Sequence, residues 1–323
     1  MNKFIKAILR IMLFFIFCLL IVGYIVVRPA FFEKQEPETI TVNSDALKKH
    51  VVHLSENLSP RSYKNISNLN QSAKYIKDQL QNYSKDVSFQ QYQAKDNEYK
   101  NVIARFGPNT KDMIVIGAHY DVMGEYAGAD DNASGVAGLI ELGRLLSQVD
   151  LKNRVELVAY TLEEPPYFAS KYMGSYIHAD SVKDKNVILM ISLEMIGYFT
   201  DEEDSQFFPI SLMKAVYPTK GNFISIVDQV FSTAASGLKN SINKYTDLPA
   251  YSTNAPIAIE GIDFSDHRNY WKFDFPAVMV TDTSFYRNDN YHTPEDTYEK
   301  LDYQSMAKVV YGVFKHVLEL DKE

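Results

Sequence analysis

The chain has 323 residues, of which 46% are hydrophobic and 23% are charged, so it is not a disordered protein and has enough apolar material for a sizeable core. Residues 1–30 contain four basic and no acidic side chains, which leaves 29 basic against 41 acidic residues for the rest. This acidic excess argues against the basic face of a nucleic-acid-binding protein, and we expect no nucleic-acid partner. The single cysteine, Cys18, excludes a disulfide framework and a zinc site built from thiolates.

An apolar segment comes first in chain order. Residues 11–27 carry no charge, three basic residues precede them, and Arg28 follows. A membrane-spanning helix needs about 17–25 apolar residues, whereas the apolar part of a cleaved signal peptide has about 7–15. We therefore expect residues 1–28 to be an uncleaved, single-pass anchor in the lipid bilayer of the cell membrane. The basic residues before the segment favour a cytoplasmic N-terminus and an extracytoplasmic body.

Helices and strands are predicted to alternate through the rest of the chain. Residues 29–45, with two prolines and several glutamates, are typical of a linker, and residues 46–323 are expected to form one domain. Apolar residues spaced by three and four predict helices, and unbroken apolar runs predict buried strands. The predicted helices are 66–83, 133–149, 170–181 and 306–318, and the predicted strands are 101–106, 113–121, 155–161, 187–193 and 275–281. This order predicts an α/β fold, a three-layer αβα sandwich with a largely parallel, mixed central sheet.

Ionisable residues follow several of the predicted strands. His119 and Asp121 end the strand 113–121 and share one of its faces, because side chains alternate along a strand. A metal-bound imidazole usually donates its other N–H to a carboxylate or carbonyl, so this pair suits a metal site. On its own the pair fits a buried structural His–Asp bond equally well.

A second group of polar residues opens the next helix. Asp130, Asp131 and Asn132 precede it directly, and Asp and Asn are preferred residues at a helix N-cap. One cap explains one of these residues. Two adjacent acids and an asparagine, following a His-x-Asp strand end, exceed what a cap requires.

Two later strands end in carboxylates. Glu163 and Glu164 are adjacent and repel each other, which is best explained if one binds a cation and the other acts as a base. Glu194 interrupts an apolar run, and a lone buried carboxylate is costly, so it needs a cation or a hydrogen-bond network.

Together with a histidine before the C-terminal helix, these segments offer two imidazoles and three carboxylates: His119, Asp131, Glu164, Glu194 and His292. Such ligands suit a pair of zinc ions that share one carboxylate. Two metals about 3.5–4 Å apart hold a hydroxide and polarise a carbonyl. Glu163, beside a ligand but not needed as one, is the candidate general base.

The order and local sequence of these motifs resemble the co-catalytic dizinc aminopeptidases, such as the bacterial leucyl aminopeptidases, which are related to glutaminyl cyclases. The resemblance covers about residues 65–315 and rests on six motifs: His119-Tyr-Asp121, Asp130–Gly135, Glu163-Glu164, Glu194–Gly197, Ser265–His267 and Tyr291–Asp296. It implies a zinc exopeptidase that removes N-terminal residues from peptides with a free N-terminus, and the apolar segment described above would anchor this enzyme in the membrane. Residues 46–323 would then be the catalytic domain, with residues 200–260, which show no regular pattern, as an irregular insertion that builds the substrate pocket.

The resemblance also implies a ligand set for two zinc ions per chain. Asp131 would bridge both ions. His119 and Glu194 would complete one site, and Glu164 and His292 the other.

Further roles follow from the same resemblance. Asp121 would orient the first imidazole ligand, and Glu163 would be the base and proton shuttle beside the dizinc-bound hydroxide. Tyr291 would stabilise the tetrahedral oxyanion, with ring packing against His292 as its alternative. The peptide bond after the bridging aspartate, Asp131, would be cis.

The chain departs from the family at one ligand. Glu194 stands where many members have aspartate, and its extra methylene would alter the metal spacing, the metal choice or recognition of the substrate amine. Asp266 and His267 are open to three interpretations: they line the pocket, hydrogen-bond a ligand or have a structural role.

Two other functions compete with the aminopeptidase. A glutaminyl cyclase would keep the fold, but known cyclases use one zinc and often have tryptophan before the last histidine, where this chain has Tyr291. A metal-free, receptor-like ectodomain would have lost ligands, whereas this chain keeps all five and the base. Both comparisons favour hydrolysis, although fold alone excludes neither alternative.

Overall fold

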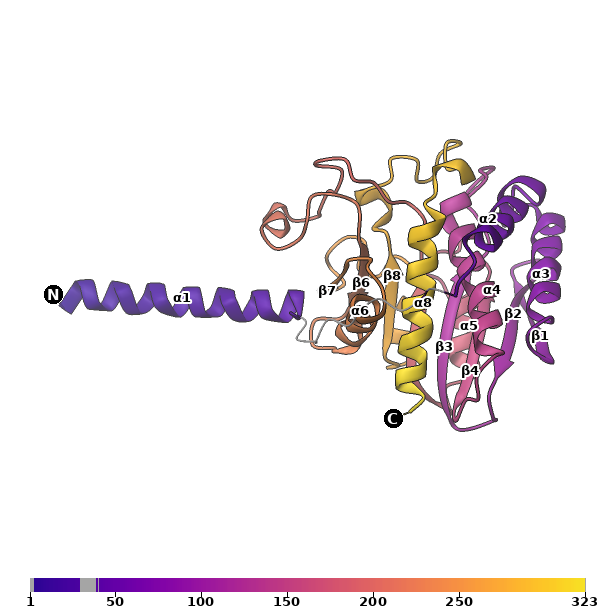
Figure 1. Ribbon diagram of the computed structural model, residues 1–323, viewed down its shortest axis with the longest axis horizontal. Helices are drawn as coiled ribbons and strands as arrows, with labels where there is room; N and C mark the ends of the chain where they lie inside the picture. Colours follow the sequence, from indigo (N-terminus) through magenta and orange to yellow (C-terminus); the bar gives the residue numbers. More distant parts are fainter. Residues whose placement is uncertain (1–2, 30–38, 40, 323) are drawn as a thin grey trace.

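A computed structural model describes residues 3–29, 39 and 41–322 of the chain. These residues form a body around an eight-stranded sheet with one long helix projecting from it (Figure 1). In spatial order, the strands are β1 (Asp86–Ala94), β2 (Asn97–Phe106), β4 (Arg154–Tyr160), β3 (Asp112–His119), β5 (Asn186–Leu193), β8 (Ala277–Thr281), β6 (Ile224–Asp228) and β7 (Ala250–Asn254).

The centre of the sheet is parallel. Strand β3 pairs in parallel with β4 and β5, and β5 pairs in parallel with β8. Antiparallel pairs occur toward the edges, between β1 and β2, between β2 and β4, and between β6 and β8. The carboxyl ends of β3, β4, β5 and β8 therefore meet at one edge of the sheet, where sites form in folds of this kind.

Helices cover both faces of the sheet, as the predicted three-layer sandwich requires. One face contacts α3 (Ile66–Leu80), α4 (Gly135–Leu146) and α6 (Ala234–Tyr245). On that side, α8 (Tyr303–Leu320) packs on α4 and α6, and α2 (Ser44–Val52) packs on α4 and α8. The opposite face contacts α5 (Gly174–Ser181) and α7 (His267–Trp271).

The central strands are buried because both of their faces are covered. Every residue of β3 after the first is buried, and its side chains enter both cores. Ile114 and Ile116 pack in the larger core, which includes the apolar faces of α3, α4 and α8, while Met113 and Val115 pack in the smaller core on the other face. This arrangement explains the unbroken apolar run from which the strand was predicted.

Helix α1 (Lys3–Val27) extends away from the body (Figure 1). It is long and apolar enough to cross a membrane, and its apolar stretch is not buried by the protein. Its C-terminal end contacts the body, because the carbonyl oxygen of Val27 accepts hydrogen bonds from Lys239 Nζ at 3.0 Å and from Ser252 Oγ at 3.1 Å. Most of the expected linker lies outside the described residues, and α2 begins at Ser44, just before the expected end of that linker.

The expectation that residues 200–260 are irregular is wrong for residues 224–254. Strand β6, helix α6 and strand β7 lie there and complete one edge of the sheet. The sequence pattern of the two strands is weak because each has only five residues. In addition, β7 contains polar side chains: Thr253 lines a pocket, and Ser252 bonds to Lys239 of α6. The edge strand β1 was missed for a similar reason, since most of its side chains are polar and partly exposed.

Candidate metal centre

Four of the predicted site residues lie at the carboxyl ends of neighbouring parallel strands. His119 is the last residue of β3, Glu163 and Glu164 follow β4, and Glu194 follows β5. All four are buried, with exposed fractions of 1%, 6%, 5% and 7%. The sheet thus brings together residues that are far apart in the sequence.

Asp121 contacts both an imidazole and the loop after β4. Its Oδ1 lies 3.6 Å from His119 Nδ1, and its carbonyl oxygen lies 3.1 Å from the same nitrogen. The two carboxylate oxygens accept the backbone N–H groups of Glu163 and Glu164, both at 3.2 Å. Asp121 therefore links the end of β3 to the two adjacent glutamates.

Asp131 lies in the turn Ala129–Ser134 that precedes α4, and its own backbone, with φ −102° and ψ 92°, is not helical. The peptide bond between Asp131 and Asn132 is cis, as the resemblance implied. The Asn132 side chain donates to the carbonyl oxygen of Leu193 at 2.8 Å. This bond attaches the turn to the end of β5, directly before Glu194.

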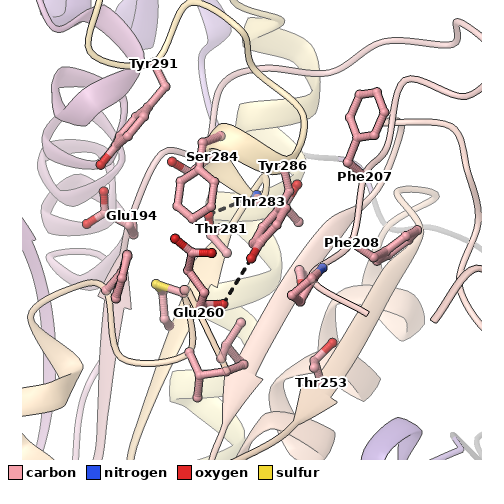
Figure 2. Close-up of a pocket in the computed structure, with 18 of the residues that line it drawn as sticks. Glu194, Phe207, Phe208, Thr253, Glu260, Thr281, Thr283, Ser284, Tyr286 and Tyr291 are labelled. Atoms are coloured by element: carbon pink, nitrogen blue, oxygen red, sulfur yellow. Dashed lines mark hydrogen bonds between the residues drawn. The ribbon is translucent and has the colours of Figure 1, made fainter. Parts of the chain in front are cut away.

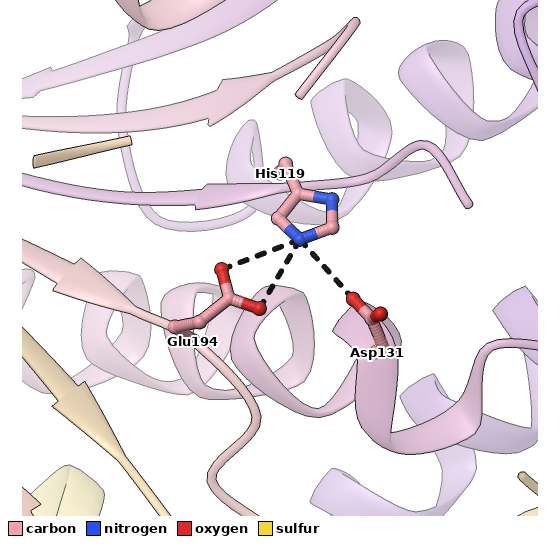
Figure 3. Close-up of side chains that lie close together, drawn as sticks. All are labelled: His119, Asp131 and Glu194. Atoms are coloured by element: carbon pink, nitrogen blue, oxygen red, sulfur yellow. Dashed lines mark hydrogen bonds and ion pairs between the residues drawn. The ribbon is translucent and has the colours of Figure 1, made fainter. Parts of the chain in front are cut away.

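Three side chains from different elements converge on one point (Figure 3). His119 Nε2 lies 3.3 Å from Asp131 Oδ1 and 3.4 Å from both carboxylate oxygens of Glu194. One imidazole nitrogen thus faces two carboxylates.

A second group forms on the other oxygen of Asp131. His292 Nε2 lies 3.0 Å from Asp131 Oδ2 and 3.3 Å from Glu164 Oε2. Among the described residues, these two groups are the sets of three with ligand atoms within 4.8 Å of one another, and they share Asp131.

The donor set fits metal ions, which are not part of this structure. Asp131 Oδ1 and His292 Nε2 are buried and make no hydrogen bond with the described residues, although each lies close to another ligand atom. Buried polar atoms are normally hydrogen-bonded, so these two need a partner. Imidazole nitrogen and carboxylate oxygen are preferred by zinc, and a cation at each group would satisfy both atoms.

The charges in the site are strongly coupled. Burial raises the pKa of Glu163 well above its ordinary value, and Glu194 and Glu164 add to the effect although His119 opposes it. Burial and the neighbouring Asp131 raise the pKa of Glu164 to about 7. Burial lowers the pKa of His119, but the surrounding carboxylates outweigh it and hold this pKa well above the usual value. The pocket therefore favours bound positive charge.

Three residues at or next to the ligands have strained backbone conformations. Leu162, Met195 and His292 have φ angles of 62°, 50° and 55°, in the left-handed region that costs a non-glycine residue roughly 1–2 kcal/mol. Leu162 directly precedes Glu163, and Met195 directly follows Glu194. Such strain is typical of functional sites, where the surrounding structure enforces it.

Glu194 is held by a serine that the sequence reasoning did not assign a role. Ser265 Oγ donates to Glu194 Oε2 at 2.7 Å, and Ser192 Oγ lies 2.9 Å from Ser265 Oγ. Both serines are fully buried. The hydroxyl pair occupies the space beside the longer carboxylate and fixes one of its oxygens.

The two ligand groups open onto a pocket of about 320 Å³ (Figure 2). Its walls are largely apolar and include Phe168, Phe207, Phe208, Met213, Tyr217, Phe223, Phe264, Phe285 and Tyr286. Glu163, Glu164 and Glu194 line its inner end. Glu260 lines the pocket too, and Figure 2 shows its carboxylate extending into the space between Glu194 and Tyr286.

Tyr291 lies between the pocket and the ligands. Its ring stacks on His292 with a centroid distance of 3.7 Å and an interplanar angle of 20°. Its hydroxyl points toward Glu194 in Figure 2, and burial together with the nearby carboxylates raises its pKa. Tyr291 therefore packs its ring on His292 and also directs its hydroxyl toward the site.

Asp266 and His267 lie behind the site. His267 is fully buried, donates through Nε2 to the carbonyl oxygen of Ile262 at 2.8 Å and packs on Trp271. Burial lowers the pKa of His267 to about 4 and raises that of Asp266 to about 7. Neither residue lines the pocket, which favours the structural interpretation for His267.

Two residues that the sequence reasoning missed position the ligand loops. The fully buried Arg61 donates to the carbonyl oxygens of Tyr120, Leu54, Ala127 and Gly128 at 2.7–2.9 Å. Asp296 accepts the backbone N–H groups of Asp130 and Asp131 at 2.9 and 3.1 Å. No local pattern marks Arg61, whereas Asp296 belongs to a motif that carried the resemblance.

Residues 101–317 match Peptidase family M28, so the family covers more than half of the chain. The chain belongs to this family, which confirms the predicted resemblance and the prediction of a peptidase, and hence of a hydrolase.

Relatives of this chain include proteins of bacteria and fungi. Uncharacterized protein YfbL of Escherichia coli (strain K12) is 48% identical over 278 residues, which are 83% of this chain and 86% of that protein. Probable aminopeptidase YDR415C of Saccharomyces cerevisiae is 27% identical over 267 residues, 75% of this chain and 65% of the yeast protein. This chain thus spans less than two thirds of the length of the yeast relative.

Solved structures share the fold at low sequence identity. A zinc aminopeptidase from Bacillus subtilis has a TM-score of 0.70 and 13% identity, over 87% of this chain and 96% of that one. A glutaminyl cyclase from Bacteroides thetaiotaomicron has a TM-score of 0.63 and 17% identity, over 85% and 97% of the two chains. The likeness establishes the mixed α/β fold and leaves the reaction to the site itself.

Proposed function

We propose that this chain is a membrane-anchored, zinc-dependent aminopeptidase with its catalytic domain in residues 46–323. The observation that carries the proposal is the pair of ligand groups that share Asp131 and open onto an apolar pocket. Two adjoining cations can activate a water molecule and polarise a carbonyl group, and an apolar pocket beside them can accept a side chain.

In this proposal the two groups hold two zinc ions. His119, Asp131 and Glu194 bind one ion, and Asp131, Glu164 and His292 bind the other. Zinc bound there supplies Lewis acidity, which polarises the scissile carbonyl and lowers the pKa of a water molecule. The buried atoms without hydrogen bonds, Asp131 Oδ1 and His292 Nε2, support this ligand assignment.

Glu163 is the proposed general base. It belongs to neither ligand group, it lines the pocket, and its raised pKa suits a carboxyl group that accepts a proton and then donates it. It would take a proton from the attacking water and give it to the leaving amine. Asp121 would keep His119 oriented, and the Tyr291 hydroxyl would donate a hydrogen bond to the oxyanion.

The charge of the site supports substrates with a free N-terminus. Five buried carboxylates surround two imidazoles: Asp121, Asp131, Glu163, Glu164 and Glu194 against His119 and His292. Two zinc ions offset most of this negative charge, and the ammonium of a peptide N-terminus is attracted by the remainder. The apolar pocket would take the first side chain.

Helix α1 is the proposed membrane anchor. The segment Phe4–Val27 has 24 residues, of which 11–27 carry no charge, and this is the length of a single membrane span. Lys6 and Arg10 near its N-terminal end favour a cytoplasmic N-terminus, which would put the catalytic domain outside the cytoplasm.

The test uses the full chain purified in detergent. It is incubated with a mixture of free and N-acetylated peptides, with and without a chelator, and the products are read by mass spectrometry. We expect chelator-sensitive loss of single residues from free N-termini only. Ammonia loss from N-terminal glutamine would support a glutaminyl cyclase instead, and no product from zinc-loaded protein would contradict both enzymes.

A further inference from the structure

Exposed apolar side chains gather near the end of α1. In the loop between β5 and β6, Leu212 is 72% exposed, Val216 is 50% exposed and Ile210 is 46% exposed. In the loop between β6 and α6, Phe231 is 82% exposed. Large apolar side chains of a soluble body are rarely grouped at such exposure without a binding partner.

These loops lie on the side of the body from which α1 projects. Figure 1 shows the loop that contains the short helix Ser211–Ala215 extending to the same side as α1. Phe231 lies three residues before α6, the helix whose Lys239 bonds the carbonyl oxygen of Val27 at the end of α1.

The end of α1 fixes where a bilayer would lie. Its apolar residues continue to Val27 and the charged Arg28 follows, so the surface of a spanned bilayer lies close to these two residues. Val27 contacts Lys239 and Ser252 directly. The edge of the body formed by α6 and β7 therefore lies at the membrane surface, next to the exposed apolar loops.

The local charge also suits a lipid surface. The body is acidic overall, but residues 205–227 contain two lysines and no acidic residue. Lys214 lies within the short helix beside Leu212, while Lys220 pairs with Glu203 at 2.8 Å. Apolar side chains flanked by lysine are typical of segments that lie in the headgroup region of anionic membranes.

We infer that the loop around Leu212 and the loop around Phe231 insert their apolar side chains into the headgroup region of the bilayer that α1 spans. This inference rests on the proposed membrane anchor. It has a consequence for the pocket, because the same loop supplies Phe208, Met213 and Tyr217 to the pocket wall. The membrane would then hold one wall of the substrate pocket in place.

The test takes advantage of the single native cysteine. Cys18, in the middle of α1, reports on the anchor itself. In a Cys18→Ser background, Leu212→Cys and Phe231→Cys report on the two loops. Asp96→Cys is the matched control, because Asp96 is exposed in the turn between β1 and β2, at the opposite edge of the sheet from β7. Each full-length variant carries an environment-sensitive fluorophore in vesicles of phosphatidylcholine and phosphatidylglycerol that contain a spin-labelled quencher lipid.

We expect quenching of about twofold or more at the two loop positions and no quenching at position 96, because the apolar face of an interfacial segment lies about 5–10 Å into the headgroup boundary. Melting curves of the unlabelled variants check that each one is folded. If Cys18 is quenched while both loop positions behave like position 96, the inference is refuted and the anchor stands. If Cys18 is not quenched, the proposed anchor fails and the inference fails with it.

Discussion

Ser265→Ala tests whether the hydrogen bond to Glu194 prepares one of the two cation sites. The substitution removes one hydroxyl from a fully buried position and adds no bulk. It breaks the 2.7 Å bond to Glu194 Oε2 and leaves Ser192 without its hydroxyl partner. The other ligand group, which contains Glu164 and His292, does not contact either serine.

The expected size of the effect follows from the charge of the acceptor. A hydrogen bond to a charged group contributes about 1.5–3 kcal/mol, and loss of such an outer partner of a metal ligand lowers metal affinity about 10–100-fold. The loss falls on the group of His119, Asp131 and Glu194. The assay is a zinc titration of metal-free protein against a chromogenic chelator, which separates a weakened site from an unchanged one.

The matched control is Ser241→Ala. Ser241 is 1% exposed, and its hydroxyl donates a hydrogen bond at 2.5 Å to the carboxylate of Glu319, which belongs to neither ligand group. We expect this control to keep two zinc sites of wild-type affinity. If Ser265→Ala also binds two zinc ions with unchanged affinity, or if both variants lose affinity alike, the proposed positioning of Glu194 is refuted.

Four more outcomes follow from the site. Glu163→Gln should lower kcat about 10²–10⁴-fold while zinc content stays at the wild-type level, and wild-type turnover would rule out Glu163 as the base. Glu164→Ala should lower the zinc content measured by atomic absorption; an unchanged stoichiometry would remove Glu164 from the ligands. Burial opposes protonation of His292, but Asp131 and Glu164 raise its pKa to about 10, so at pH 7 a metal ion must displace its proton. Zinc affinity should therefore rise with pH and zinc binding should release protons, which calorimetry in buffers of different ionisation enthalpy detects; heats that do not depend on the buffer would contradict this. Glu260→Gln should lower kcat/KM for peptides with N-terminal lysine by about 2–5-fold relative to leucine, as expected for one exposed ion pair, and an equal change for both peptides would exclude this contact.

Much of the site was predictable because its residues interrupt apolar patterns. Glu194 follows the strand β5, whose last five residues are buried, and His119 ends another strand, so the polarity of both residues needs an explanation that the core does not offer. The parallel sheet then brings these strand ends together without any further information. Order along the chain was therefore enough to group the candidate ligands.

Other parts of the site were not predictable because they depend on contacts between distant segments. Arg61 has no local motif, and it matters only because the folded chain brings four carbonyl groups around its guanidinium. Ser265 appears in a recognisable motif, but its bond to Glu194 spans 71 residues. Strand β7 was missed because its polar side chains face the pocket or bond to α6 and do not pack in a core.

Hydrogen bonds within the chain hold the ligand-bearing loops in place. Asp121 and Asp296 use their carboxylates to accept backbone N–H groups of the ligand loops, and Ser265 fixes one oxygen of Glu194. Asp131 Oδ1 and His292 Nε2 are buried as well, but neither atom makes a hydrogen bond with any residue that the structure describes. The fold thus keeps these ligand atoms close together at a cost in free energy, and a bound cation would offset that cost. Changes in ligands should for this reason affect metal content more than folding, whereas loss of a residue such as Arg61, whose donors hold the loops, should affect both.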